Sequence, residues 1–311
     1  NTAGSDGGGV HVRGSESYPV LNNVVISNNS SSGNGGGIDI SNCCGYVLLS
    51  INSSTISNNT ANGGDGGGIY KYGNDINISY TTISGNTANS SGGGFFAIGD
   101  VQMDHVEITD NSANNGGGLF LQSAPSTLNH ITVANNTANN SGGGLRVCCG
   151  EPVNIENSIF YNNSPQEISY SSNDGSPNII NVLYSNVSGG QDSVEFGESN
   201  DSLYWGQGNI DVDPFFADTA NGDYSLLTGS QCIDAGNPDA DGDSLTWETD
   251  GQPWEIFSVA PASDLRVRFE NANQRMVLTT GDLPIGTGTV LGLTEDARRT
   301  SHIVNGSGVQ A

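Results

Sequence analysis

The sequence predicts an all-β fold, a right-handed parallel β-helix (a solenoid of about seven coils) followed by a small C-terminal β unit. One observation is a motif in which an asparagine turn, three glycines and an apolar strand follow one another, recurring every 25 to 30 residues. The other is that apolar residues occupy three fixed positions of each repeat, with no helical apolar spacing over ten residues or more. Such a period is typical of solenoids, whose repeats bury their apolar sides only against one another.

The strand that follows each glycine triplet alternates between apolar and polar residues. Alternation with period two indicates a strand with one face toward the core. The apolar column of this strand consists of Val10, Ile38, Ile69, Phe95, Leu119 and Leu145.

Two further apolar columns precede the next asparagine of the repeat. The nearer column consists of Ile26, Ile56, Ile83, Ile108, Val133 and Phe160. The other, five residues earlier, consists of Leu21, Ile51, Ile78, Met103, Leu128 and Ile155. Three columns separated by turns predict a coil with about three sides. Its strands pair in parallel with those of the next coil, and parallel crossovers are overwhelmingly right-handed.

The repeated asparagines and glycines have structural roles in this prediction. Asparagine tolerates the left-handed backbone of a sharp turn. Copies stacked about 4.8 Å apart are expected to form a ladder of amide hydrogen bonds. The ladder positions are Asn1, Asn29, Asn59, Asn86, Asn111, Asn136 and Asn163. The glycines supply positive φ at the next corner, and no Gly-Lys-Ser/Thr follows them, so they do not form a phosphate loop.

Composition limits the classes of partner. The 311 residues include 33 acidic and 8 basic side chains, for a net charge of −25. This charge argues against nucleic acid and against anionic membrane surfaces as partners. No run of 18 apolar residues occurs, so we expect no membrane insertion. The chain starts at Asn1 inside a repeat, and we expect a leader or earlier coils to precede it.

Three segments differ in composition and pattern. Residues 1–189 carry the repeats and form the predicted β-helix. Residues 190–251 are polar and acidic and form a closing segment. Residues 252–311 hold five of the eight basic side chains and contain alternating stretches at 265–269 and 289–293. We interpret them as a small β unit that caps the open edge of the solenoid or packs along its side.

The closing segment contains the strings DxDPxF, NGDYxL and GSxCIDAG between Asp211 and Gly236. Together they resemble the closing segment of bacterial choice-of-anchor Q surface proteins. The upstream NNTAN…GGGI repeats resemble polymorphic outer-membrane-protein repeats of the same β-helix group. The resemblance covers about residues 1–251 and implies a secreted or cell-surface β-helix, often without an assigned activity. The chain departs from that family after Pro253, where it continues Trp-Glu-Ile-Phe.

The five cysteines include two adjacent pairs, Cys43–Cys44 and Cys148–Cys149. The pairs lie four coils apart, about 19 Å at one strand spacing per coil. A disulfide needs Cα atoms within roughly 7 Å, so the pairs do not bridge each other. Each pair closes on itself or remains reduced; for an extracellular chain we predict two vicinal disulfides and a buried thiol at Cys232.

One acidic segment, 239–250, has the spacing of a calcium loop. Oxygen ligands at its first, third, fifth and last positions match such a loop, with the carbonyl of the seventh residue as a further ligand. The predicted calcium ligands are Asp239, Asp241, Asp243, Leu245 and Asp250. Ser244 replaces the usual glycine and Asp250 the usual glutamate, so a solvated acidic loop is the alternative.

Three consecutive repeats place an aromatic residue at the outward position after the glycines: Tyr70, Phe96 and Phe120. A row of rings one strand spacing apart is a candidate glycan-binding surface. An apolar seam between two molecules and a second small core under a loop are the alternatives.

The favoured function is a secreted or cell-surface, non-catalytic β-helix that is adhesive or structural. It binds a polysaccharide or glycan surface, or assembles with itself into extracellular matrix or filaments. The alternative is a polysaccharide lyase or hydrolase, for which Asp104 and Glu156 share a column with Asn129 between them, and His105 and His130 stack beside Asp104. An ice-binding threonine ladder ranks last, because Glu107 interrupts its column.

Overall fold

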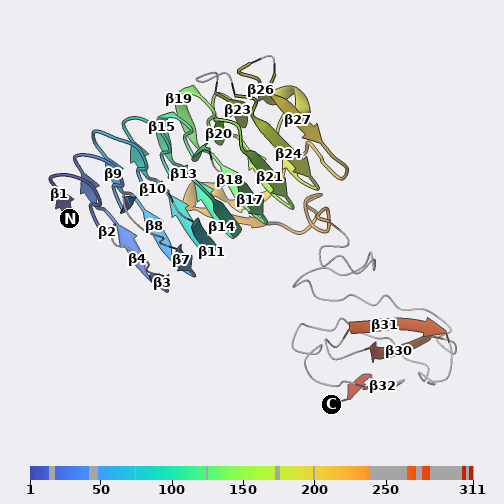
Figure 1. Cartoon of the computed structure of the whole chain (residues 1–311). Helices are drawn as coiled ribbons and strands as arrows, with labels where there is room; N and C mark the ends of the chain where they lie inside the picture. Colours follow the sequence, from blue (N-terminus) through green and yellow to red (C-terminus); the bar gives the residue numbers. More distant parts are fainter. Residues whose placement is uncertain are drawn as a thin grey trace. The chain divides into compact units, whose positions relative to one another are not determined.

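The computed structural model describes residues 1–13, 18–41, 48–73, 75–123, 125–171, 176–198 and 200–237, and the backbone of 265–270, 275–280, 303–305 and 308–310. The chain divides into two compact units, Asn1–Asn237 and Pro238–Ala311. The first unit is a parallel β-solenoid of about seven turns, as the repeats predict (Figure 1). No helix among the described residues has the length and apolarity of a membrane span.

Three parallel sheets form the sides of the solenoid. Within the described part of the chain, the first sheet has six short strands that follow the ladder asparagines: β1 (Thr2–Ala3), β5 (Ser30–Ser31), β9 (Thr60–Ala61), β12 (Thr87–Ala88), β15 (Ser112–Asn115) and β19 (Thr137–Ser141). The second sheet follows the glycine triplets with β2 (Val10–Val12), β6 (Ile38–Ser41), β10 (Ile69–Tyr72), β13 (Phe95–Ile98), β16 (Leu119–Gln122), β20 (Leu145–Cys148), β23 (Ile168–Tyr170) and β26 (Val194–Glu195).

The third sheet carries the two remaining apolar columns. Its strands are β3 (Val20–Asn22), β4 (Val25–Ser27), β7 (Leu48–Asn52), β8 (Thr55–Ser57), β11 (Asp75–Ser84), β14 (Val101–Thr109), β17 (Ser126–Asn129), β18 (Thr132–Ala134), β21 (Pro152–Glu156), β22 (Ile159–Tyr161), β24 (Ile179–Leu183), β25 (Asn186–Val187) and β27 (Ser202–Trp205). Most coils contribute two of these strands in succession, and in β11 and β14 the two halves are continuous.

A residue with left-handed backbone separates the two halves in each coil that contributes both. Tyr80 has φ of 47° within β11, and His105 has φ of 53° within β14. We call this row the kink row; it contains Asn23, Ser53, Tyr80, His105, His130, Asn157 and Tyr184. The chain bends sharply at a left-handed residue, so two of the three predicted columns lie on either side of one bend rather than on two separate sides.

The three predicted columns form the interior. Their members pair in register from coil to coil, as Ile78 does with Met103 and Met103 with Leu128. Ile69, Phe95 and their partners in the second sheet are fully buried. The columns therefore supply one continuous apolar core that runs along the solenoid.

One inward position of the second sheet carries a charged residue. Lys71 pairs in register with Ile40 and Ala97 and is 1% exposed. Its Nζ donates a hydrogen bond to the backbone carbonyl of Asp100 at 3.0 Å. Burial lowers the pKa of Lys71 to about 8. The long methylene stem fills an apolar position while the ammonium reaches a carbonyl at the end of the next strand.

The predicted asparagine ladder is confirmed and buried. Oδ1 of Asn111 accepts hydrogen bonds from the backbone N and the Nδ2 of Asn86, at 2.9 and 3.0 Å. Asn111 in turn donates from its own N and Nδ2 to Oδ1 of Asn136, both at 3.0 Å. The same pair of hydrogen bonds recurs between successive members from Asn29 to Asn163. At the end of the ladder Glu167 takes the place of the next asparagine and accepts from N and Nδ2 of Asn163.

The solenoid continues beyond the predicted boundary at residue 189. A short 3-10 helix, η1 (Gly190–Ser193), leads into β26, and β27 follows; both strands pair in parallel with the preceding coil. Val194 is buried in the core, and Trp205 packs against it. The polar, acidic residues of this last coil lack the motif of the earlier repeats, which is why the sequence placed it in the closing segment.

After the last coil the chain returns along the third sheet. β28 (Phe216–Asp218), the 3-10 helix η2 (Thr219–Asn221) and β29 (Asp223–Leu226) form an antiparallel hairpin. The Tyr224 hydroxyl donates to Oδ2 of Asp110 at 2.9 Å and accepts from Nδ2 of Asn135 at 2.7 Å. The hairpin is thereby fixed to two consecutive coils of the solenoid.

The second unit contains short antiparallel strands in its described residues. β30 (Leu265–Glu270) pairs with β31 (Arg275–Thr280), and β32 (Ile303–Asn305) pairs with β33 (Gly308–Gln310). The first strand covers the alternating stretch at 265–269. The second predicted stretch, 289–293, lies outside the described residues.

Candidate functional site

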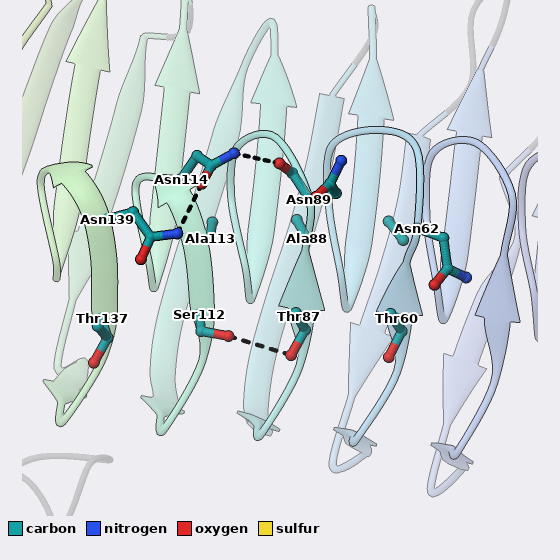
Figure 2. A pocket seen from close by; sticks show the side chains of 11 residues that line it. Thr60, Asn62, Thr87, Ala88, Asn89, Ser112, Ala113, Asn114, Thr137 and Asn139 are labelled. Carbon is teal, nitrogen blue, oxygen red and sulfur yellow. Dashed lines mark hydrogen bonds between the residues drawn. The ribbon is translucent and has the colours of Figure 1, made fainter.

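A groove runs along the first sheet (Figure 2). A row of hydroxyl groups borders one side and a row of amides the other, with buried alanines between them. The groove is lined mainly by Thr60, Thr87, Ser112 and Thr137, by Asn62, Asn89, Asn114 and Asn139, and by Ala61, Ala88 and Ala113. We call it the TAN groove, because most coils supply it with the tripeptide Thr-Ala-Asn.

The regularity of the TAN groove follows from the ladder beside it. In each coil a buried ladder asparagine immediately precedes the groove strand, as Asn86 precedes β12. Thr87 pairs in register with Thr60 on one side and with Ser112 on the other. Because neighbouring strands of a sheet lie about 4.8 Å apart, the groove presents one hydroxyl and one amide per coil at that spacing.

Hydrogen bonds between coils order part of the groove. The hydroxyls of Thr87 and Ser112 lie 3.2 Å apart. Nδ2 of Asn139 donates to Oδ1 of Asn114 at 2.8 Å, and Nδ2 of Asn114 donates to the carbonyl of Asn89 at 2.6 Å. A hydroxyl offers one donor and two lone pairs, and a side-chain amide offers two of each. Both rows therefore keep donors and acceptors available for a ligand.

No residue that lines the TAN groove is ionisable, although the chain carries 33 acidic side chains. Hydroxyls and amides both donate and accept hydrogen bonds without a net charge. Such a surface is complementary to a neutral ligand rich in hydroxyl groups. The groove was missed from the sequence because Thr-Ala-Asn was interpreted as part of a turn; its recurrence in coil after coil was the available signal.

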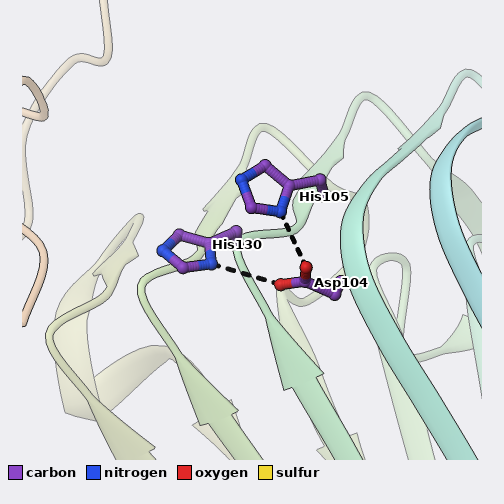
Figure 3. A group of neighbouring side chains, drawn as sticks. All are labelled: Asp104, His105 and His130. Carbon is purple, nitrogen blue, oxygen red and sulfur yellow. Dashed lines mark hydrogen bonds and ion pairs between the residues drawn. The ribbon is translucent and has the colours of Figure 1, made fainter. Parts of the chain in front are cut away.

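A second polar cluster lies on the kink row (Figure 3). Nδ1 of His105 is 2.9 Å from Oδ2 of Asp104, and Nδ1 of His130, one coil further, is 3.2 Å from Oδ1 of the same carboxylate. The two imidazole rings stack with centroids 4.6 Å apart, and Tyr80 stacks on His105 at 4.8 Å. Burial alone would raise the pKa of Asp104, but the hydrogen bonds from the two histidines outweigh it and hold the pKa below its usual value.

The predicted column of a catalytic carboxylate pair is present in the third sheet. Asp104 pairs in register with Asn129, and Asn129 with Glu156, so the two carboxylates are two coils apart. Nδ2 of Asn129 donates to Oδ1 of Asp104 at 3.2 Å, and the side chain of Asn237 donates to Oε1 of Glu156 at 2.8 Å. Glu156 is thus engaged by the returning segment and is not directed at Asp104.

The predicted aromatic row exists, but its rings do not form an open surface. Tyr70 and Phe96 stack at 5.3 Å between ring centroids, and Phe96 and Phe120 at 5.2 Å. Phe96 is only 5% exposed and Phe120 only 6%. Together with Cys148 they form a separate apolar cluster, which matches the alternative of a second small core.

The turn between the first and second sheets lies close beside this row, and the ring faces stack on one another. A Cβ built on Gly92, which has φ of +66°, would lie 2.7 Å from Cβ of Phe96, so the turn passes directly over the strand. Arg146 lies over the Phe120 ring at 5.9 Å and donates to Oδ1 of Asn115 and to the hydroxyl of Ser141. A sugar ring therefore has no access to the faces of Phe96 and Phe120.

Cys148 and Cys149 form a vicinal disulfide beside this cluster. Cys232 is a free, half-buried thiol whose pKa is raised by burial. Cys43 and Cys44 lie outside the described residues. The whole predicted calcium loop, with Asp239, Asp241, Asp243, Leu245 and Asp250, lies outside them as well.

Comparison with protein families matches residues 23–41 to the Chlamydia polymorphic membrane protein repeat. The matched residues include β4, β5 and β6, one ladder asparagine and one glycine triplet. Neither the curated proteins nor the solved structures contain a match to this chain.

Proposed function

We propose that the chain belongs to a bacterial surface protein and that its solenoid binds a neutral polysaccharide along the TAN groove. The match to a polymorphic membrane protein repeat supports the surface location. The observation that carries the binding proposal is the pair of parallel hydroxyl and amide rows, which repeats in four consecutive coils without an ionisable residue. An extended chain of sugar rings presents hydroxyl groups periodically, and a groove of periodic donors and acceptors is complementary to it.

The proposed role is binding without catalysis. Glycoside hydrolysis uses two carboxyl groups that flank the scissile bond, and the TAN groove contains none. Asp104 and Glu156, the carboxylates that share a column, belong to the third sheet, and Glu156 is bonded to Asn237. The groove is therefore equipped to hold a polysaccharide and not to cleave it.

The test uses substitutions that remove hydroxyls and keep side-chain volume. Thr87→Val with Thr137→Val changes the TAN groove, and Thr82→Val with Thr132→Val is the matched control on the third sheet. Affinity for a panel of neutral polysaccharides is measured by affinity electrophoresis. Two lost hydrogen bonds at about 1 kcal/mol each weaken binding about tenfold or more, while the control changes it less than twofold.

Two results would contradict this proposal. One is the absence of binding to every polysaccharide of the panel. The other is an equal loss of affinity in the groove variant and in the control. Release of new reducing ends during the same incubation would favour the hydrolase alternative.

Two further parts of the function rest on the sequence alone. The resemblance of Asp211–Gly236 to choice-of-anchor Q proteins stays a prediction about the type of surface protein. Calcium binding by residues 239–250 stays a proposal, checked by a melting temperature that falls when a chelator is added, since an ion bound only to the folded state stabilises it.

A further inference from the structure

We propose that Asp104, His105 and His130 form a binding site for a divalent transition-metal ion, with zinc as the reference ion. One carboxylate oxygen and one nitrogen from each imidazole all lie within 4.8 Å of one another. The site is on the third sheet, whereas the TAN groove is on the first, so this proposal stands independently of polysaccharide binding.

The backbone of the kink row sets the geometry. His105 and His130 occupy the same left-handed position in two successive coils, with φ of 53° and 50°. Their side chains therefore leave the backbone in the same direction, and the rings stack at 4.6 Å with 28° between their planes. Asp104, directly before His105, lies where both Nδ1 atoms reach its carboxylate (Figure 3).

The distances are close to those of a metal centre. Ligands of one tetrahedral zinc ion at about 2.0 Å lie about 3.3 Å from each other. The two distances from the carboxylate oxygens to the Nδ1 atoms are 2.9 and 3.2 Å. These two distances reach the two different oxygens of Asp104, and the ligand atoms of the whole set lie within 4.8 Å of one another. Rotation of the imidazoles must therefore bring both nitrogens closer together for them to bind one ion. The proton of each neutral ring then resides on Nε2, the ring nitrogen that points away from Asp104 (Figure 3).

Neighbouring amides hold the carboxylate in place. Nδ2 of Asn129 donates to Oδ1 of Asp104 at 3.2 Å, and Nδ2 of Asn157 donates to Oδ1 of Asn129 at 3.0 Å. The backbone N of Asn237 donates to Oδ1 of Asn157, so the returning segment ends this chain of bonds. Partners of this kind orient the ligands of metal sites and raise their affinity.

The donor set indicates the class of ion. Two imidazole nitrogens and one carboxylate oxygen suit zinc, nickel or copper, whereas calcium and magnesium prefer oxygen ligands. The side chains of Asp104 and His105 are 45% and 42% exposed, so an ion enters from solvent and keeps water in its remaining positions. Three protein ligands with an open position are the arrangement of zinc sites that exchange a bound group.

The test measures zinc binding to the full chain after treatment with a chelator. Isothermal titration in the presence of millimolar calcium is expected to show a site with micromolar affinity, and zinc is expected to raise the melting temperature. His130→Asn is expected to weaken binding at this site at least tenfold. Asparagine is compatible with the left-handed backbone, as Asn157 in the next coil shows, so the variant keeps the kink.

His11→Asn is the matched control, because His11 also pairs with a carboxylate, Asp39 at 3.0 Å, but no second histidine joins it among the described residues. This control is expected to bind zinc as the unaltered chain does. Three results would overturn the proposal: no zinc binding tighter than millimolar, equal affinity in the unaltered chain and His130→Asn, or an equal loss in both variants. In the second case any bound zinc belongs to another part of the chain.

Discussion

Replacing Asn111 by alanine tests whether the amide ladder stabilises the solenoid as strongly as its geometry indicates. Asn111 is 1% exposed, and its side chain makes four hydrogen bonds. Oδ1 accepts two from Asn86, and Nδ2 donates to the carbonyl of Ile83 at 2.9 Å and to Oδ1 of Asn136 at 3.0 Å. Alanine removes all four and leaves the backbone N of Asn86 without the partner it has at 2.9 Å.

The expected loss follows from these bonds. At about 1 kcal/mol of net stabilisation each, four bonds correspond to a loss of about 4 kcal/mol in the free energy of unfolding. Asn89→Ala is the matched control, because Asn89 is an exposed member of the amide row of the TAN groove, one coil before Asn114. Removing an exposed polar side chain typically changes stability by about 0.5 kcal/mol.

Both variants are compared with the unaltered chain by urea unfolding followed by circular dichroism. Because coils of a solenoid unfold partly independently, the comparison uses the midpoint and slope of the main transition in all three proteins. If Asn111→Ala loses less than about 1 kcal/mol, or no more than Asn89→Ala, the ladder does not stabilise the fold. Water that replaces the lost amide would be the physical reason.

Two pH-dependent predictions concern buried charges. Burial lowers the pKa of Lys71 from 10.5 to about 8, so the folded chain binds the proton of the Lys71 ammonium more weakly than the unfolded chain does. The free energy of unfolding therefore falls as the pH drops from 10.5 to 8, and below pH 8 the full loss is present. Lys71→Met is therefore expected to raise the unfolding free energy at pH 7 by up to about 3 kcal/mol, with a smaller gain at pH 10; equal gains at both values would contradict this. Burial raises the pKa of Glu167 from 4.5 to about 7, so stability from this group falls between pH 4.5 and 7 and stays reduced above. Glu167→Gln is expected to lessen the stability difference between pH 5 and pH 8 measured by urea unfolding, and an unchanged difference would show that Glu167 does not titrate in this range.

Most of the fold could be predicted because the apolar columns are periodic. Ile78, Met103 and Leu128 occupy the same position of successive repeats, and strand pairing brings equivalent positions together. The solenoid has three sides, as predicted, but the three apolar columns do not lie on one side each. Two columns share the third sheet, since the left-handed residues at Tyr80 and His105 bend one sheet and do not begin another. A positive φ at tyrosine or histidine has no local sequence signal of its own.

The candidate sites were harder to predict from the sequence. Thr87-Ala88 has the composition of a turn, and only pairing with the coils on either side makes it a strand that borders a groove. The outward position of Phe96 was predicted, but not its burial, because the turn beside it consists of glycine and short polar residues without an apolar pattern. The repeat spacing already places Asp104, His105 and His130 next to one another. Their shared carboxylate became evident only with the side-chain geometry.

The asparagine ladder also has a direction, with consequences for how the length of such a chain changes. From Asn29 to Asn136 each ladder asparagine accepts from the member before it and donates to the member after it. Asn163 donates instead to the carboxylate of Glu167, which has no amide with which to donate further. If a coil is duplicated anywhere before Glu167, its ladder asparagine accepts from the amide of the previous coil and donates to the side-chain oxygen of the next. A coil added after Glu167 has no ladder amide before it from which to accept. Duplication within the gene can therefore lengthen the molecule from its middle while one residue continues to mark where the series stops.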